Sequence, residues 1–283
     1  MMHGKAAKTR TVIAMVMPYL CLPGSLALAS PTQGYKLQMT KEEIFISLVI
    51  PAYNEAEGIA STLERVSGYF SQKDYAFEII VVDDGSTDNT REIIKNLSYN
   101  VPGVRLMGED INKGKGFSIK QGMLQANGKY ILFCDADLST PIEELDKIVP
   151  FFAQGYDVII GSRALQGPDL LKQPFIRHSM GKIFNLLTRL LGLTRLKDTQ
   201  CGFKCFSRDA AYDIFNRQRH DGFCFDVEIL YLTGLLGYRV KDVPVKWFNR
   251  KDSRVKIIRD PLRMLFGLFS IKAHILLGTY GKK

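Results

Sequence analysis

Hydrophobic positions change their spacing in a regular way from residue 46 onward. Short, nearly continuous apolar runs that are typical of buried strands cover residues 46–51, 77–84, 103–108, 129–137 and 157–162. Segments with apolar residues at helical spacing lie between them, at residues 55–70, 87–97 and 115–126 and after Pro141. Alternating strands and helices form βαβ units, and continuous apolar strands are typical of a parallel sheet covered on both faces. The pattern predicts an α/β domain with a mostly parallel central sheet and helices on both faces.

Polar side chains gather where the predicted strands end. They are Tyr53 to Glu55, Asp83 and Asp84, Asp135 and Asp137, and Ser162 and Arg163. In a parallel sheet the carboxyl ends of the strands meet at one edge, and ligands bind there. We therefore expect these four clusters to form one site.

Asp135 and Asp137 stand one residue apart directly after the apolar run YILFC. Carboxylates so close repel each other unless a cation lies between them. On an extended turn they can share a divalent cation, which keeps coordination positions open for phosphate oxygens. Such an ion neutralises charge that develops on a phosphate leaving group. The alternative for this short motif alone is a solvated turn.

The first two strand ends have two interpretations each. Asp83 and Asp84 could accept hydrogen bonds from a base or a ribose, or they could start the next helix as N-cap residues. Tyr53 offers a ring for stacking and Glu55 an acceptor, although an acid also suits a helix N-terminus. The segment NKGKG at 112–116 offers lysines near phosphates, yet it matches neither the P-loop nor the GxGxxG motif.

Composition narrows the class of protein only a little. Of 283 residues, 46% are hydrophobic and 24% are charged, which suits a globular domain with a sizeable core. The net charge of +9 indicates an anionic partner: a nucleic acid, a phosphorylated ligand or an acidic membrane. The five cysteines form no CxxC pair, so neither a disulfide framework nor a zinc site is favoured, and a reducing compartment is expected.

Both ends of the chain differ from the domain between them. Residues 1–40 place basic residues before an apolar stretch that ends in Ala27-Leu28-Ala29, which fits a signal peptide, a weak anchor or an over-long start. Residues 182–191 and 258–283 carry apolar stripes with basic residues around them. Buried packing and membrane contact both fit these helices, and the basic flanks favour membrane contact.

The motifs LVIPAYNE, IIVVDDGSTDNT, NKGKG, DADLSTP, GSR and DTQCGFK stand in the order found in family 2 inverting glycosyltransferases. The chain resembles this family over residues 45–257, which would form its catalytic domain. The resemblance is closest to the polyprenyl-phosphate branch, which includes dolichyl-phosphate β-glucosyltransferases and mannose synthases. It implies a single domain of GT-A fold.

The resemblance also implies roles for individual residues. It assigns the nucleoside to residues of the first two strand ends and a nearby lysine, namely Pro51, Tyr53, Glu55, Asp83, Asp84 and Lys115. It assigns Mg²⁺ or Mn²⁺ to Asp135 and Asp137, and the acceptor phosphate to Arg163 and Arg177. A further group would line the donor sugar, namely Asp198, Gln200 and Gly202. Glu228 stands where relatives place a catalytic acid.

One position departs from the mannose synthases, which have Gln where Ser139 stands. The shorter hydroxyl puts a third protein ligand to the metal in doubt and favours glucose over mannose. The expected reaction is transfer of a hexose from UDP-glucose to a polyprenyl phosphate, with inversion, at the cytoplasmic face of a membrane. The alternatives are a GDP-mannose donor or another acceptor.

Two other classes of protein explain fewer of these sequence features. Haloacid-dehalogenase-type phosphatases also end a strand in DxDx[T/V], but their first Asp stands near the start of the domain, and here three strand–helix units precede it. A nucleic-acid binder would explain the positive charge. It would not explain carboxylates at strand ends, because these repel a phosphate backbone.

Overall fold

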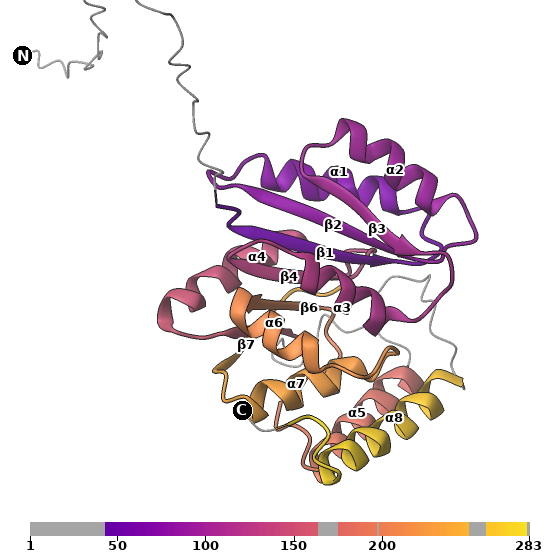
Figure 1. The fold of residues 1–283 in the computed structure, drawn as a ribbon, viewed down its shortest axis with the longest axis vertical. Helices are drawn as coiled ribbons and strands as arrows, with labels where there is room; N and C mark the ends of the chain where they lie inside the picture. The colour runs from indigo at the N-terminus through magenta and orange to yellow at the C-terminus, as the bar shows by residue number, and fades with distance from the viewer. Residues whose placement is uncertain (1–42, 164–174, 197, 249–258, 282–283) are drawn as a thin grey trace, which may run out of the picture. The chain divides into compact units, whose positions relative to one another are not determined.

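The computed structural model describes residues 43–163, 175–196, 198–248 and 259–281 (Figure 1). A seven-stranded sheet in the order β3-β2-β1-β4-β6-β5-β7 forms its centre. The strands are β1 (Ile46–Ala52), β2 (Phe77–Asp84), β3 (Val104–Glu109), β4 (Tyr130–Cys134), β5 (Val158–Ser162), β6 (Phe203–Ser207) and β7 (Val240–Pro244). Among these seven described strands, only β6 runs antiparallel to its neighbours, so the predicted mostly parallel sheet is confirmed. Strands β6 and β7 were not predicted.

The helices that connect the first strands begin close to the predicted residues. They are α1 (Ile59–Phe70), α2 (Thr90–Asn100) and α3 (Lys115–Gln125). The segment after Pro141 is a short series of turns, namely η1 (Ile142–Glu144), α4 (Leu145–Ile148) and η2 (Val149–Gln154). The second half contains α5 (Phe175–Leu190), α6 (Arg208–Arg217), α7 (Phe225–Leu235) and α8 (Arg259–Leu276).

Side chains of the sheet alternate between two buried layers, because neighbouring residues of a strand point to opposite faces. From β1, Leu48 and Ile50 pack with α1, α2 and the α4 region, whereas Val49 packs on the other face with α3, α6 and α7. Helices therefore cover both faces of the sheet, as the apolar strand pattern predicted (Figure 1).

A third, smaller cluster joins α5, α7 and α8. Its buried members include Val227 from α7 and Leu268 and Ile271 from α8, and Leu187 of α5 packs against them. Figure 1 shows α5 and α8 side by side. In the part of the chain that the structure describes, no helix is long and apolar enough to cross a membrane. The apolar segment predicted at residues 1–40 lies outside the described residues.

Candidate active site

The carboxyl ends of β1, β2, β4 and β5 meet at one edge of the sheet, as parallel pairing requires. Strand β6 runs the opposite way, with Phe203 paired to Cys134, so its first residues reach the same edge. The predicted clusters after β1, β2, β4 and β5 are thus joined by the segment that precedes β6. That segment contains Asp198, Gln200 and Gly202.

Hydrogen bonds tie the first two strand ends together. The side-chain oxygen of Asn54 accepts from the backbone N–H of Thr87 at 2.8 Å, and the N–H of Asn54 donates to Ser86 Oγ at 2.9 Å. Asn54 adopts the left-handed conformation with φ of 54°, which asparagine tolerates well. Pro51 lies in β1 beside Val82, and Tyr53 is 38% exposed at the end of the strand. The ring of Tyr53 is therefore accessible to a ligand.

Asp83 and Asp84 are both buried, yet their contacts differ. One oxygen of Asp83 accepts from Ser86 Oγ at 2.5 Å, whereas Oδ2 lies 3.4 Å from Arg91 Nε and has no hydrogen bond from a described residue. Asp84 accepts the backbone N–H groups of Lys113 and Gly114 at 2.8 and 2.9 Å. Burial raises the pKa of Asp84, and these two hydrogen bonds oppose the rise. Asp84 therefore holds the NKGKG loop, and Asp83 keeps an acceptor for a ligand.

Asp135 and Asp137 lie in a tight turn after β4. The N–H of Leu138 donates to the Asp135 carbonyl at 3.1 Å, and Leu138 has φ of 47°. Both carboxylates are partly exposed. Ser139 donates to Asp137 twice, from its N–H and from its hydroxyl, each at 2.8 Å. The Ser139 hydroxyl thus orients Asp137.

Lys115 is the cation next to this pair. Its Nζ donates to Asp135 Oδ1 at 2.5 Å from the first turn of α3. Burial lowers the pKa of Lys115, but the attraction of Asp135 and Asp226 outweighs it and raises the pKa overall. Gly202 also lies against Asp135, and any side chain at 202 would overlap with the Asp135 carboxylate. Glycine at 202 leaves room for that carboxylate.

Arg163 and Asp198, predicted for different substrates, form one ion pair. Arg163 donates from Nε and Nη2 to the two oxygens of Asp198 at 2.8 and 2.7 Å, and its guanidinium lies 5.5 Å from the centre of the Trp247 ring. Burial opposes the charge on both groups, but the pairing prevails, so the pKa of Asp198 is lowered and that of Arg163 is raised. Gln200 follows Asp198, and its buried Nε2 donates to no described residue.

The structure does not place Glu228 with the strand-end carboxylates. Its side chain is fully buried and accepts from the backbone N–H groups of Arg219 and His220 at 3.0 and 2.8 Å. The hydroxyl of Tyr280 donates to it at 2.7 Å. These contacts hold the segment after α6 (residues 218–222) against the C-terminal tail (residues 277–281). The catalytic role of Glu228 stays a prediction.

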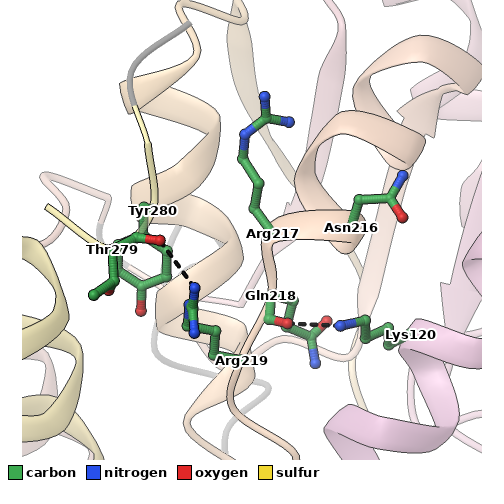
Figure 2. A pocket seen from close by; sticks show the side chains of 7 residues that line it. All are labelled: Lys120, Asn216, Arg217, Gln218, Arg219, Thr279 and Tyr280. Carbon is green, nitrogen blue, oxygen red and sulfur yellow. Dashed lines mark hydrogen bonds between the residues drawn. The ribbon is translucent and has the colours of Figure 1, made fainter.

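The tail and this segment also border a cavity of 360 Å³ (Figure 2). There Arg219 donates to the carbonyl of Thr279 at 3.0 Å, and Lys120 donates to that of Gln218 at 2.7 Å. Three residues further on, the carbonyl of Asp221 accepts from Phe117 N–H in α3 at 3.1 Å. The C-terminal tail is thus connected, through Glu228 and this segment, to the helix that carries Lys115.

Arg177 lies on α5, but its side chain is outside the described residues. Sequence reasoning missed a buried ion pair close to the site, formed by Lys204 of β6 and Asp226 of α7. Lys204 is fully buried and also donates to the carbonyl of Cys201 at 2.7 Å. Burial raises the pKa of Asp226, and the attraction of Lys204 and Lys115 opposes the rise. A lysine inside the apolar run FKCF was the available signal, because an unpaired lysine is costly to bury.

The carboxylate pair fits a Mg²⁺ or Mn²⁺ ion that is shared with a phosphorylated substrate. Carboxylate oxygens are ligands that these hard cations prefer. Among the described residues, however, no group of three or more His, Cys, Asp or Glu side chains could hold a metal ion. Asp135 and Asp137 would therefore supply only part of the coordination shell, and phosphate oxygens and water would supply the rest.

The fold and this edge of the sheet define a glycosyltransferase of GT-A type. Residues 47–215 match the family described as Glycosyl transferase family 2, and the chain belongs to that family. The family and fold predicted from the motifs are thereby confirmed, whereas the roles of individual residues stay predictions.

Two relatives and one solved structure illustrate the similarity. Dolichyl-phosphate beta-glucosyltransferase ALG5C of Trichomonas vaginalis is 35% identical over 252 residues, which are 85% of this chain and 74% of that protein. Dolichyl-phosphate beta-glucosyltransferase of Saccharomyces cerevisiae is 34% identical over 258 residues, 84% of this chain and 77% of that one. Glucosyl-3-phosphoglycerate synthase of Mycobacterium tuberculosis, solved with Mn²⁺, UDP and glucosyl-3-phosphoglycerate, superposes with a TM-score of 0.58 at 19% identity, covering 81% and 80% of the two chains.

Proposed function

We propose that this protein transfers glucose from UDP-glucose to dolichyl phosphate or a related polyprenyl phosphate, with inversion at the anomeric carbon. The observation that carries the proposal is the similarity to two dolichyl-phosphate glucosyltransferases over more than four fifths of the chain. The acceptor is a membrane lipid and the donor is a soluble nucleotide. We therefore infer that the enzyme acts at a membrane surface, on the cytoplasmic face where sugar nucleotides are available.

The nucleoside would lie at the ends of β1 and β2. Asp83 Oδ2 is a buried acceptor with no hydrogen bond from a described residue, and a base N–H would satisfy it. The Arg91 guanidinium at 3.4 Å compensates part of its charge, and a donor group of the base would supply the hydrogen bond that it lacks. The Tyr53 ring offers a stacking surface at the same edge.

The donor diphosphate would lie next to Asp135 and Asp137. A divalent cation held by these carboxylates would neutralise the charge that grows on the leaving UDP. Lys115 adds a second positive charge, because its ammonium group already lies at Asp135. The solved structure with Mn²⁺ and UDP supports this combination for the fold. Gly202 keeps the space beside Asp135 free of side-chain atoms.

The acceptor phosphate carries an anionic oxygen near neutral pH, so attack on the anomeric carbon needs no strong general base. What the reaction needs is orientation of that oxygen in line with the bond that breaks. Arg163 suits this role, since Asp198 fixes its guanidinium through two hydrogen bonds and leaves other N–H groups for a phosphate. Displacement from the opposite side converts an α-linked donor into a β-linked product.

The test is an assay of purified protein with polyprenyl phosphate, Mg²⁺ and labelled UDP-glucose, with GDP-mannose in parallel. Label from UDP-glucose in the organic extract, lost on addition of a chelator, is the expected result. Label from GDP-mannose alone would assign the protein to the mannose branch. Nucleotide binding without labelled lipid from either donor would refute the proposed acceptor.

A further inference from the structure

Helices α5 and α8 are apolar on two sides. On α8, Met264, Leu268 and Ile271 face the third hydrophobic cluster. Phe266 and Phe269 lie on the opposite side of the helix, at 71% and 55% exposure. A surface helix needs only one apolar side to pack on its domain. The second apolar side of α8 therefore calls for a partner outside the domain.

The same holds for α5, where Phe184 and Leu187 pack inward. Its outer stripe consists of Ile183, Leu186 and Leu190, which are spaced by three and four residues and are 57%, 51% and 74% exposed. The outer side of α8 continues into Leu276 and Leu277, which are 78% and 75% exposed. These seven residues, which we call the outer apolar face, are seven of the twelve exposed large hydrophobic side chains that the structure describes.

The sequence of these two helices carries mostly positive charge. Residues 175–196 contain four arginines and lysines and no acid, and residues 259–281 contain three and a single acid, Asp260. By helical geometry Arg263 and Lys272 flank the α8 stripe on its two sides, and Lys272 also donates to the carbonyl of Leu191 at 3.1 Å. Long basic side chains at the border of an apolar stripe are typical of helices that lie in an anionic lipid surface.

A cleft lies between the start of α8 and the candidate active site. It has a volume of 380 Å³ and lies between the NKGKG loop, with Lys113 and Lys115, and the start of α8, with Arg263, Met264 and Gly267. Lys115 also contacts Asp135. A lipid phosphate that leaves the bilayer plane at α8 would therefore enter between cationic side chains on its way to Asp135.

We propose that the outer apolar face of α5 and α8 docks on an anionic lipid bilayer and presents this cleft to the phosphate end of the acceptor. The proposal rests on the proposed function, because an enzyme must reach the bilayer surface only if its acceptor is a membrane lipid. A second copy of the chain fits less well. A symmetric contact would bring together two copies of helices whose sequences are mostly positive, and like charges oppose such an interface.

The experiment measures flotation of the full chain with vesicles of phosphatidylcholine, with and without phosphatidylserine. The variant is Phe266→Glu with Phe269→Glu, and the matched control is Tyr99→Glu, which changes an aromatic side chain that is 76% exposed on α2. We expect wild type and control to float with the anionic vesicles. The double variant should lose binding by about tenfold or more, because two phenylalanines no longer enter the lipid. Circular dichroism melts check that all three chains fold.

Wild type that does not bind anionic vesicles, or a double variant that binds as well as wild type, would overturn the proposal. A wild-type dimer in solution that the double variant converts to a monomer, with no vesicle binding, would assign the face to a second copy instead. Activity on a short-chain prenyl phosphate in detergent separates the two proposals. The double variant should keep this activity in detergent. If wild type lacks the activity, the proposed function is refuted, whereas the result of the vesicle experiment is unaffected.

Discussion

Asp135 and Asp137 are separated by one residue, and so are Asp226 and Glu228. The first two lie in the turn after β4, and both are partly exposed. The second two lie in the first turn of α7, where Asp226 is 3% exposed and Glu228 is fully buried. The two acidic pairs look alike in the sequence, yet only the first has oxygens that a ligand can reach.

Local geometry explains the difference. In a helix, residues two apart point to nearly opposite sides and do not face each other. Asp226 accordingly pairs with Lys204 of β6, whereas Glu228 accepts from the 219–220 backbone and from Tyr280. The turn after β4 instead leaves Asp135 and Asp137 partly open. What marks a binding pair is therefore the acceptor capacity that remains after folding, and not the spacing alone.

The largest effect is expected at the exposed pair. Asp135→Asn and Asp137→Asn should each lower turnover by about two to three orders of magnitude, because the charge on the leaving group is no longer neutralised. Stability should change by no more than about 1 kcal/mol, since both groups are partly exposed. Glu228→Gln, the matched control in the buried pair, should keep turnover wherever it folds. Initial rates measure the loss of turnover, and urea melts measure the change in stability. Near-normal rates in either Asp variant would refute the metal assignment.

Lys204→Met probes the buried pair and should cost about 3–5 kcal/mol of unfolding free energy at neutral pH, because Asp226 then carries an unpaired buried charge. The loss should shrink in mild acid, where Asp226 can take up a proton. Adding Asp226→Leu should recover much of the stability. Urea melts at two pH values measure these changes, and a double variant that is less stable than Lys204→Met would contradict this account.

Tyr280→Phe removes one hydrogen bond to the Glu228 carboxylate and should cost about 2 kcal/mol. Because Glu228 holds the segment that supports α3 and Lys115, we also expect a higher KM for the sugar nucleotide with little change in kcat. The matched control is Tyr231→Phe, which removes a hydroxyl from the neighbouring ring. Equal KM values for wild type and Tyr280→Phe would show that the tail stabilises the fold without positioning the lysine.

Ser139→Ala tests how the exposed pair is oriented. Without the hydroxyl that donates to Asp137, we expect about tenfold weaker Mn²⁺ binding in the presence of UDP. Titration calorimetry with Mn²⁺ measures it directly. Ser139→Thr keeps a hydroxyl and should restore most of the affinity, and unchanged binding in Ser139→Ala would exclude the orienting role.

The smallest effect concerns pH. Burial lowers the pKa of His220 below its ordinary value of 6.5, against the pull of Glu228 and Asp221. The folded protein then binds fewer protons than the unfolded chain, so His220 stabilises the fold above pH 6.5, and this contribution is lost as the pH falls through the lowered pKa. His220→Gln should flatten the dependence of stability on pH in that window. An unchanged slope in melts across the window would contradict the assignment.

The sequence predicted best what depends on local pattern. The five parallel strands and α1 to α3 follow from apolar runs and helical spacing, and the carboxylates at strand ends follow from sheet topology. Strand β6 escaped prediction because buried Lys204 interrupts its apolar pattern and its partners β4 and β5 are distant in the chain. The contacts of Asp84 and Glu228 also escaped, since backbone N–H groups from separate loops satisfy them.

The position of β6 has a consequence for how the chain folds. It lies between β4 and β5 although it follows both in the sequence. As the protein leaves the ribosome, β4 therefore has an unpaired edge until β6 has been made, and β5 cannot join the sheet before then. An open strand edge is a site for mispairing and aggregation. Synthesis of β6, the strand that directly follows Gly202, therefore covers the open edge of β4 and ends the risk of mispairing. A pause in synthesis before residue 207 would prolong the exposure of that edge.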